Sequence, residues 1–133
     1  MEEVLHNILI HTYNADPLLR GQAEVALKQF IISEGAVFAL LSFLGNKTIH
    51  RDLRQAAAII IKNKIFELWR TVPGDEEHEK VLLTPTDKDQ AKSMLIETLL
   101  AETDNSIRGL IAEAVKSIAE VDYPERYRYF PSI

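Results

Sequence analysis

RQAAAIIIKN, residues 54–63, is one of three segments in which an arginine is followed eight residues later by a lysine. The other two are RGQAEVALKQ at 20–29 and RGLIAEAVKS at 108–117. In all three, apolar residues stand one residue before the arginine and three, six and seven residues after it. Self-similar segments separated by tens of residues predict similar structural units that stack on one another.

The shared spacing is that of an amphipathic helix. At about 100° per residue, the apolar positions fall within an arc of roughly 100°, which predicts the buried face. The lysine lies on the opposite side, so we expect it in solvent. The arginine lies at the edge of the arc, where its stem packs and its head pairs with a neighbour. Lys64 occupies a core position, so either it reaches out at the helix end or the register slips there.

Each segment is preceded by another apolar stretch that predicts a helix: EEVLHNILIHTY at 2–13, GAVFALLSFLG at 35–45 and DKDQAKSMLIETLLAE at 87–102. Residues suited to cap the helices stand at their starts. They are Asp16, Asp104 and, more weakly, His50 for the second helices, Ser33 for the helix that ends before Gly45, and Thr86 with Asp89 in a capping-box position.

A single hairpin of this length cannot bury its apolar face alone. We therefore predict an all-α fold, an α-solenoid of about three helical hairpins. The expected boundaries are repeat 1 at about 1–32, repeat 2 at about 33–70, a loop at 71–86 and repeat 3 at about 87–121.

Composition narrows the class of protein. A hydrophobic content of 47% and a charged content of 26% are globular values. The net charge of -5 argues against nucleic acid as the main partner. The absence of cysteine excludes disulfides and thiolate zinc sites. The start of the chain lacks the basic region of a secretory signal, and no apolar run approaches the ~18 residues that span a bilayer. We expect a soluble intracellular protein without membrane insertion.

Signs of catalysis are weak. The chain has no Gly-rich phosphate loop, G-x-S-x-G or H-E-x-x-H motif, and its four histidines, His6, His11, His50 and His78, lack metal-ligand spacing. We predict no catalytic residue, no metal, no cofactor and no enzymatic activity. The acidic run from Asp75 to Glu79 either attracts a basic segment or is a solvated loop. Aromatic residues near the predicted helix ends favour packing over base stacking.

RQAAAIIIKNKIFELW, residues 54–69, resembles the N-terminal signature of the importin-β (karyopherin-β) family. AEVALKQF at 23–30 and NSIRGLIAEAVKSIAEVDYPERY at 105–127 support the resemblance, which covers essentially the whole chain. The Lys-Asn pair, the Pro-Gly-Asp loop after Trp69 and the DYPER tail resemble the importin seven and importin eight branch most. Tyr127 departs from that branch, which tends to carry Trp there. The resemblance implies HEAT repeats, with the start of a fourth repeat at about 122–133. A solenoid that ended there would expose an apolar face, so we expect an N-terminal piece of a longer protein.

The resemblance also implies a function. In this family the second helices of the first hairpins, on the concave face, receive the small GTPase Ran in its GTP form, which controls cargo binding and release. The contact candidates are Lys28, Lys62, Asn63 and Lys116, with Lys62 and Asn63 first because they match the family motif. The alternative for each lysine is an ordinary solubilising side chain. We assign Arg20, Arg54 and Arg108 to architecture, bonded to an adjacent repeat's carboxylate or to helix-end carbonyls.

The resemblance places cargo and nucleoporin contacts in later repeats, and it places the protein in the cytoplasm, the nucleus and the nuclear pore at the nuclear envelope. Three alternatives remain open: a HEAT-repeat scaffold without Ran binding, an exportin, and a small helical enzyme. Import or export, cargo identity and pairing with another importin depend on sequence beyond these repeats.

Overall fold

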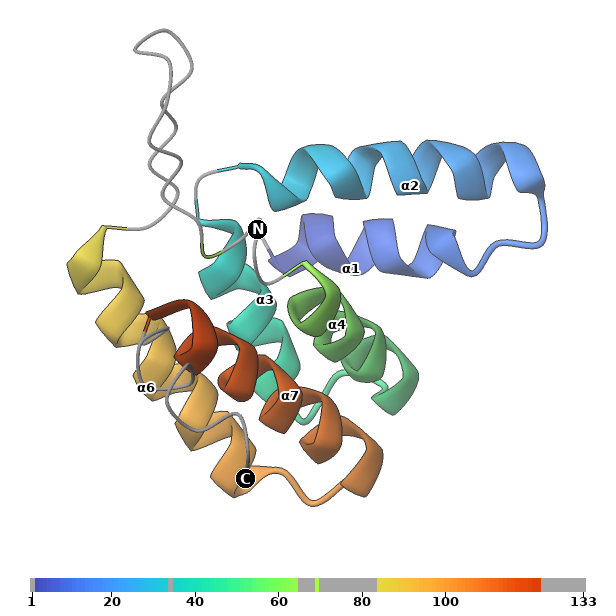
Figure 1. Ribbon diagram of the computed structural model, residues 1–133. Coiled ribbons are helices and arrows are strands. Elements are labelled where there is room, and N and C mark those ends of the chain that lie inside the picture. Colours follow the sequence, from blue (N-terminus) through green and yellow to red (C-terminus); the bar gives the residue numbers. More distant parts are fainter. Residues whose placement is uncertain (1, 34, 65–68, 70–83, 123–133) are drawn as a thin grey trace, which may run out of the picture.

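The structure is a computed structural model that describes residues 2–33, 35–64, 69 and 84–122. These residues form helices and no strand, which confirms the all-α prediction. The helices pair as hairpins, α1 with α2, α3 with α4 and α6 with α7 (Figure 1). Their bounds are α1 Glu2–Thr12, α2 Pro17–Ile31, α3 Ala36–Gly45, α4 Arg51–Asn63, α6 Pro85–Ala101 and α7 Asn105–Asp122. The expected start of repeat 4 and most of the expected loop at 71–86 lie outside the described residues.

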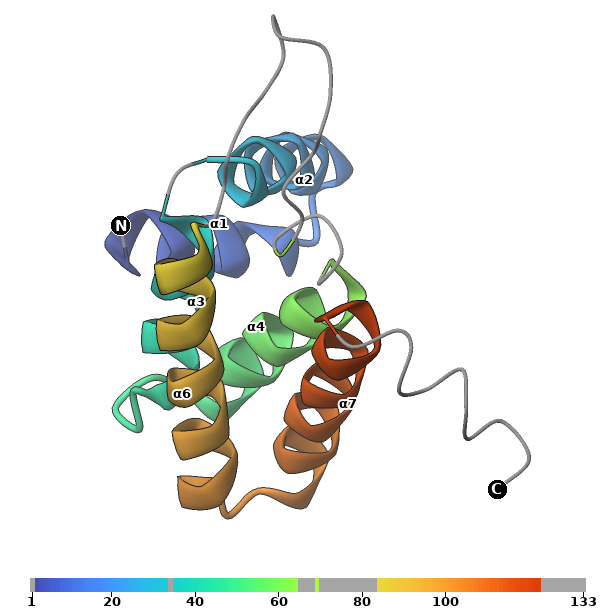
Figure 2. The same ribbon diagram turned by 60° about the vertical axis from the view of Figure 1, so that its left-hand side comes forward.

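The second and third hairpins stack in two layers. α3 packs against α6 in one layer, and α4 packs against α7 in the other (Figure 2). The first hairpin is placed differently, because α1 packs against both α3 and α4 while α2 packs mainly against α1. α1 therefore lies between α2 and the second hairpin (Figures 1 and 2).

The shared apolar register forms the core. The positions three residues after each repeat arginine, Ala23, Ala57 and Ile111, are all buried. The largest fully buried side chains come from all three hairpins, and burial of each large aliphatic one contributes about 1.5–3 kcal/mol. They are Leu5, Leu9, Leu40, Phe43, Leu44, Ile61, Trp69, Ile107 and Ile111. Lys64, the misfit of the register, is the C-cap of α4 and is half-buried, so the helix ends where the core pattern fails.

Three of the predicted caps are present. Asp16 Oδ1 accepts a hydrogen bond from the Leu18 N–H at 2.9 Å, and Pro17 follows at the first helical position. Asp104 Oδ1 accepts from the N–H groups at the start of α7. His50 Nδ1 accepts from the Asp52 N–H at 3.1 Å. These contacts satisfy backbone donors that the first turn of a helix leaves without partners.

Two predicted caps are wrong. α6 begins at Pro85, and the capping box joins Thr84 to Asp87, two residues before the predicted pair Thr86 and Asp89. Pro85 explains the shift, because its fixed φ and missing N–H suit the first helical position.

The start of α3 also differs from the prediction. The Ser33 hydroxyl donates to the Phe30 carbonyl at 2.5 Å, so Ser33 closes α2 and does not cap α3. Gly35 occupies the N-cap with φ of 82°, a conformation that glycine adopts without steric cost. Gly45 is the last residue of α3, and Asn46 follows as the C-cap.

No single described helix is both long and apolar enough to cross a membrane. α2 and α3 pass that test only as a joined pair, bent by 113° where they meet.

Candidate protein-binding surface

The candidate surface is the solvent side of α4 and α7, which carries three of the predicted contact residues. Lys62 and Asn63 lie in the last turn of α4, and Lys116 lies in the second half of α7. Asn63 and Lys116 are exposed, and Lys62 is partly exposed. The neighbouring Ile61 is buried, so the helix turns its apolar side inward and its lysine outward, as the helical wheel predicts.

An ion pair joins the two helices on this surface. Lys62 Nζ lies 3.2 Å from Glu113 Oε2 of α7, with side-chain exposures of 38% and 59%. A pair this exposed contributes about 0–1 kcal/mol, because water screens it and ordering two long side chains costs entropy. Glu113 and Lys116 are three residues apart on α7 and therefore share a face. The surface thus presents alternating charges, Lys62, Glu113 and Lys116.

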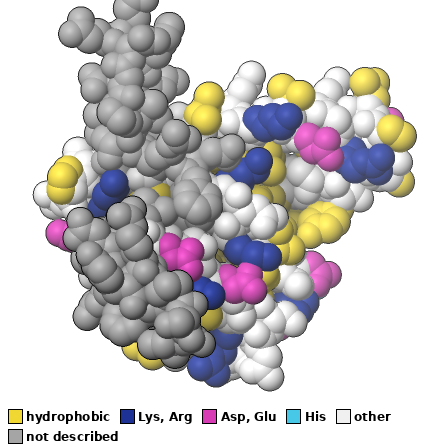
Figure 3. Space-filling view, in the orientation of Figure 1, with side chains coloured by type: hydrophobic (Ala, Val, Ile, Leu, Met, Phe, Trp, Pro, Cys, Tyr) yellow, Lys and Arg dark blue, Asp and Glu magenta, His cyan; other side chains and the backbone are white. Residues whose placement is uncertain are grey.

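Lys28 does not extend this surface into one row across three stacked helices. It is exposed in the last turn of α2, and α2 packs mainly against α1 instead of packing along α4 as α7 does. The repeat register correctly turns Lys28 outward, but the placement of the first hairpin separates its helix from the other two. Lys and Arg side chains appear over α2 and over the α4–α7 region, with acidic side chains between them (Figure 3).

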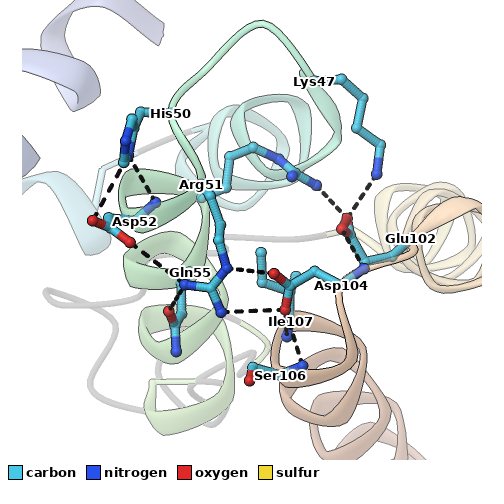
Figure 4. A network of polar contacts seen from close by, with 10 residues as sticks. Lys47, His50, Arg51, Asp52, Gln55, Glu102, Asp104, Ser106 and Ile107 are labelled. Atoms are coloured by element: carbon cyan, nitrogen blue, oxygen red, sulfur yellow. Dashed lines mark hydrogen bonds and ion pairs between the residues drawn. The ribbon is translucent and has the colours of Figure 1, made fainter.

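A buried ion pair joins α4 to the turn that precedes α7. Arg54 is only 6% exposed, and its Nε donates to the Leu44 carbonyl at the end of α3 at 2.9 Å. Its other end binds the carboxylate of Glu102, which lies in the turn between α6 and α7. Lys47 Nζ also donates to Glu102 Oε2, at 2.8 Å (Figure 4). Two residues of the second hairpin therefore bind the turn that joins α6 to α7.

The environment keeps Glu102 ionised. Burial works to raise the pKa of Glu102, but the hydrogen bonds from Lys47 and Arg54 outweigh burial and leave the pKa below its usual value. The Asp104 N–H donates to the other carboxylate oxygen at 3.3 Å. A buried carboxylate with this many donors is satisfied only when it is charged.

A second ion pair runs beside the first. Arg51 Nε binds Asp104 Oδ2, and Arg51 Nη2 donates to Asp104 Oδ1 at 3.3 Å. Asp104 also accepts from the N–H groups of Ser106 at 3.0 Å and Ile107 at 3.1 Å (Figure 4). The hydrogen bond from Arg51 and then the Ile107 N–H lower the pKa of Asp104, and the same contact with Asp104 raises the pKa of Arg51. One carboxylate thus caps α7 and anchors it to α4.

The three repeat arginines occupy different environments. Arg54 has the partners expected of an architectural arginine, whereas Arg20 and Arg108 are exposed. Glu102, the partner of Arg54, stands six residues before Arg108 in the third hairpin. The corresponding residue of the second hairpin, six before Arg54, is Thr48, which is uncharged and could not form an ion pair with Arg20. A corresponding partner for Arg108 would belong to a following hairpin, outside the described residues. Sequence reasoning missed Glu102 as the partner of Arg54, the contact of Lys47 with Glu102 and the ion pair of Arg51 with Asp104, because the repeat register does not specify contacts between hairpins.

The described residues hold no group of three or more His, Asp or Glu side chains that could bind a metal ion.

Comparison with known proteins identifies the family. Residues 23–101 match the family described as importin-beta N-terminal domain. The chain belongs to this family. It is 28% identical over 132 residues to exportin-2 of Dictyostelium discoideum, covering 98% of this chain and 13% of that protein. It is also 28% identical over 129 residues to the probable importin-7 homolog of the same organism, covering 96% of this chain and 12% of that protein.

Other relatives agree with these two. Exportin-2 of Drosophila melanogaster is 23% identical over 125 residues, which cover 94% of this chain and 12% of that protein. The solved structure of the exportin Cse1 in its cargo-free, cytoplasmic state matches with a TM-score of 0.76 and 24% identity, covering 96% of this chain and 13% of that one. This likeness confirms the HEAT-type solenoid. The chain spans about an eighth of the length of these relatives. Because the relatives include both importins and exportins, the predicted importin seven and importin eight branch is only partly supported.

Proposed function

We propose that this chain is the N-terminal region of a nuclear transport receptor and that it binds Ran in its GTP form. The observation that carries the proposal is the solvent side of α4 and α7, which presents Lys62, Asn63 and Lys116 and is bridged by the Lys62–Glu113 ion pair. Lys62 and Asn63 lie within residues 23–101, which match the importin-β family.

The surface has the physical properties that such binding needs. The buried contacts of Arg54 with Glu102 and the contacts of Arg51 with Asp104 hold α4 and α7 together, so a partner meets two helices in a fixed arrangement. The exposed Lys62–Glu113 pair is weak, so Lys62 can exchange Glu113 for a carboxylate of the partner at little cost. Lysines facing solvent also speed the encounter with an acidic patch.

Selectivity for the nucleotide state would come from the partner. In small GTPases the γ-phosphate and Mg²⁺ order the switch segments, and hydrolysis releases them. A rigid surface such as that of α4 and α7 binds the ordered form better because it does not have to order the segments itself. The affinity of this chain alone is expected to be weak, since the relatives are about eight times longer.

The full protein would carry cargo through the nuclear pore between cytoplasm and nucleus, using later repeats for cargo and nucleoporins. Import is the direction we propose. Export is the second candidate, because the identity to exportin-2 equals the identity to the importin-7 homolog. If the chain does not bind Ran, a role as a HEAT-repeat scaffold would replace both import and export.

A titration with two nucleotide states tests the proposal. Purified Ran loaded with a non-hydrolysable GTP analogue or with GDP is titrated against this chain, and we expect binding in the GTP state only. A Lys62→Glu/Lys116→Glu variant is expected to weaken binding at least about tenfold. Lys92→Glu on α6, the same substitution at one position of the other layer, serves as control and should bind like the unmodified chain. Equal binding of both nucleotide states would contradict the proposal and favour the plain scaffold.

A further inference from the structure

A carboxylate of α7 already occupies Lys62, the first of the predicted contact residues. Glu113 Oε2 lies 3.2 Å from Lys62 Nζ, and the side chains of Glu113 and Lys62 are 59% and 38% exposed. A partner that approaches the solvent side of α4 and α7 therefore meets a lysine with a carboxylate bound to it. An acidic group of the partner also meets the like charge of Glu113.

The surface around this pair carries carboxylates as well as lysines. Glu113, Lys116 and Glu120 are spaced by three and four residues on α7, so they share one face of the helix, and all three are exposed. Together with Lys62 they make two lysines and two glutamates, whose formal charges cancel. The two glutamates therefore weaken the attraction of the two lysines for an acidic partner.

The two glutamates differ in what they bind. Glu113 forms the ion pair with Lys62, whereas Glu120 forms no ion pair with any residue that the structure describes, and neither does Lys116. Glu120 thus contributes negative charge alone. Glu113 contributes the same charge and in addition occupies a lysine.

We propose that Glu113 limits the affinity of this surface by competing with a carboxylate of the partner for Lys62. The inference rests on the proposed function, in which Lys62 and Lys116 bind acidic groups of Ran. If Glu113 stays in place, it lies next to the incoming carboxylate, and the two like charges repel. If Glu113 moves away, the repulsion ends but its ion pair with Lys62 is lost. In both cases the presence of Glu113 weakens binding.

The arrangement of the helices does not depend on Glu113. The buried Arg54–Glu102 pair and the Arg51–Asp104 pair join the second hairpin to the third, and the Lys62–Glu113 pair is exposed. An exposed pair contributes little to stability. Replacing Glu113 by glutamine, which has nearly the same shape, therefore removes the competing charge and leaves α4 and α7 in position.

The test titrates Ran, loaded with a non-hydrolysable GTP analogue, against the unmodified 133-residue chain, Glu113→Gln and Glu120→Gln. Each variant removes one negative charge from the same face of α7, so both change the net charge equally. We expect Glu113→Gln to bind about three- to fivefold more tightly than the unmodified chain. Glu120→Gln should gain less than about twofold, because salt screens a charge that contacts no lysine.

A second comparison assigns the gain to Lys62. In a Lys62→Met background Glu113 has no ammonium group to occupy at this position, so Glu113→Gln should change the affinity by less than about twofold. A full gain that persists without Lys62 would mean that Glu113 acts through its charge alone, and it would overturn the proposal.

The titrations also separate this inference from the proposed function. Unchanged or weaker binding of Glu113→Gln, or equal gains from Glu113→Gln and Glu120→Gln, would overturn the role of Glu113 while Ran binding by the unmodified chain still stands. If neither the unmodified chain nor Glu113→Gln binds Ran in the GTP state, both proposals are overturned together. Circular dichroism of each variant checks that the helices are intact.

Discussion

Replacing Arg54 by methionine is expected to destabilise the fold by about 3 kcal/mol. The change removes the 2.9 Å hydrogen bond to the Leu44 carbonyl, worth about 1 kcal/mol. It also breaks a buried ion pair with Glu102, whose side chain is only 1% exposed. Loss of one partner from a buried pair costs about 3–5 kcal/mol. Lys47 still neutralises Glu102 at 2.8 Å, so the total should fall at the lower end of that range.

Urea unfolding at pH 7 measures this loss, with thermal unfolding as a second readout. A change of 3 kcal/mol corresponds to a lower melting temperature by about 10 °C in a domain of this size. Arg108→Met is the matched control, because it makes the same substitution at the aligned but exposed position and should stay within about 0.5 kcal/mol. A double-mutant cycle with Glu102→Gln should show a coupling of at least about 1 kcal/mol. Equal losses at Arg54 and Arg108, or no coupling, would refute the reasoning.

Three further predictions concern the same fold. The lowered pKa of Glu102 means that its stabilisation is present above the ordinary pKa of 4.5 and is lost as the pH falls through the folded pKa; the difference in unfolding free energy between the unmodified chain and Glu102→Gln should therefore shrink below about pH 4.5 in urea titrations. Thr84→Ala should cost about 1 kcal/mol in urea unfolding by removing the capping box of α6, and an unchanged midpoint would contradict that role. Phe43→Ala, at a fully buried site, should cost about 3–5 kcal/mol, whereas a cost below 1 kcal/mol would mean that the second hairpin packs differently.

The hairpins could be predicted because each helix encodes its own buried face. Ala23, Ala57 and Ile111 share one register position and are all buried, and period alone places them there. The apolar period does not decide between two cap candidates that stand close together. Thr84 and Thr86 differ by two residues, and the rigid φ of Pro85 decides between them, a local effect weaker than the apolar period.

The placement of the first hairpin and the partners of Arg54 could not be predicted in the same way. Both depend on contacts between hairpins, which a repeat register does not specify. Arg20 and Arg54 occupy the same register position, yet of these two only Arg54 forms an ion pair that the structure describes, because α2 does not pack along α4 as α4 packs along α7. The outward orientation of the lysines follows from the same helical period as the buried core. Adjacency of Lys28 and Lys62 would require α2 to pack along α4, and the period does not specify that contact.

The most direct test of the central proposal is hydrogen–deuterium exchange of this chain with and without Ran. With Ran in the GTP state, we expect slower exchange in the last turn of α4 around Lys62 and Asn63 and in α7 around Lys116, and no change in α3 or α6. With Ran in the GDP state, we expect no protection. Protection confined to α3 and α6, or identical protection in both nucleotide states, would contradict the assignment of the α4–α7 surface to Ran.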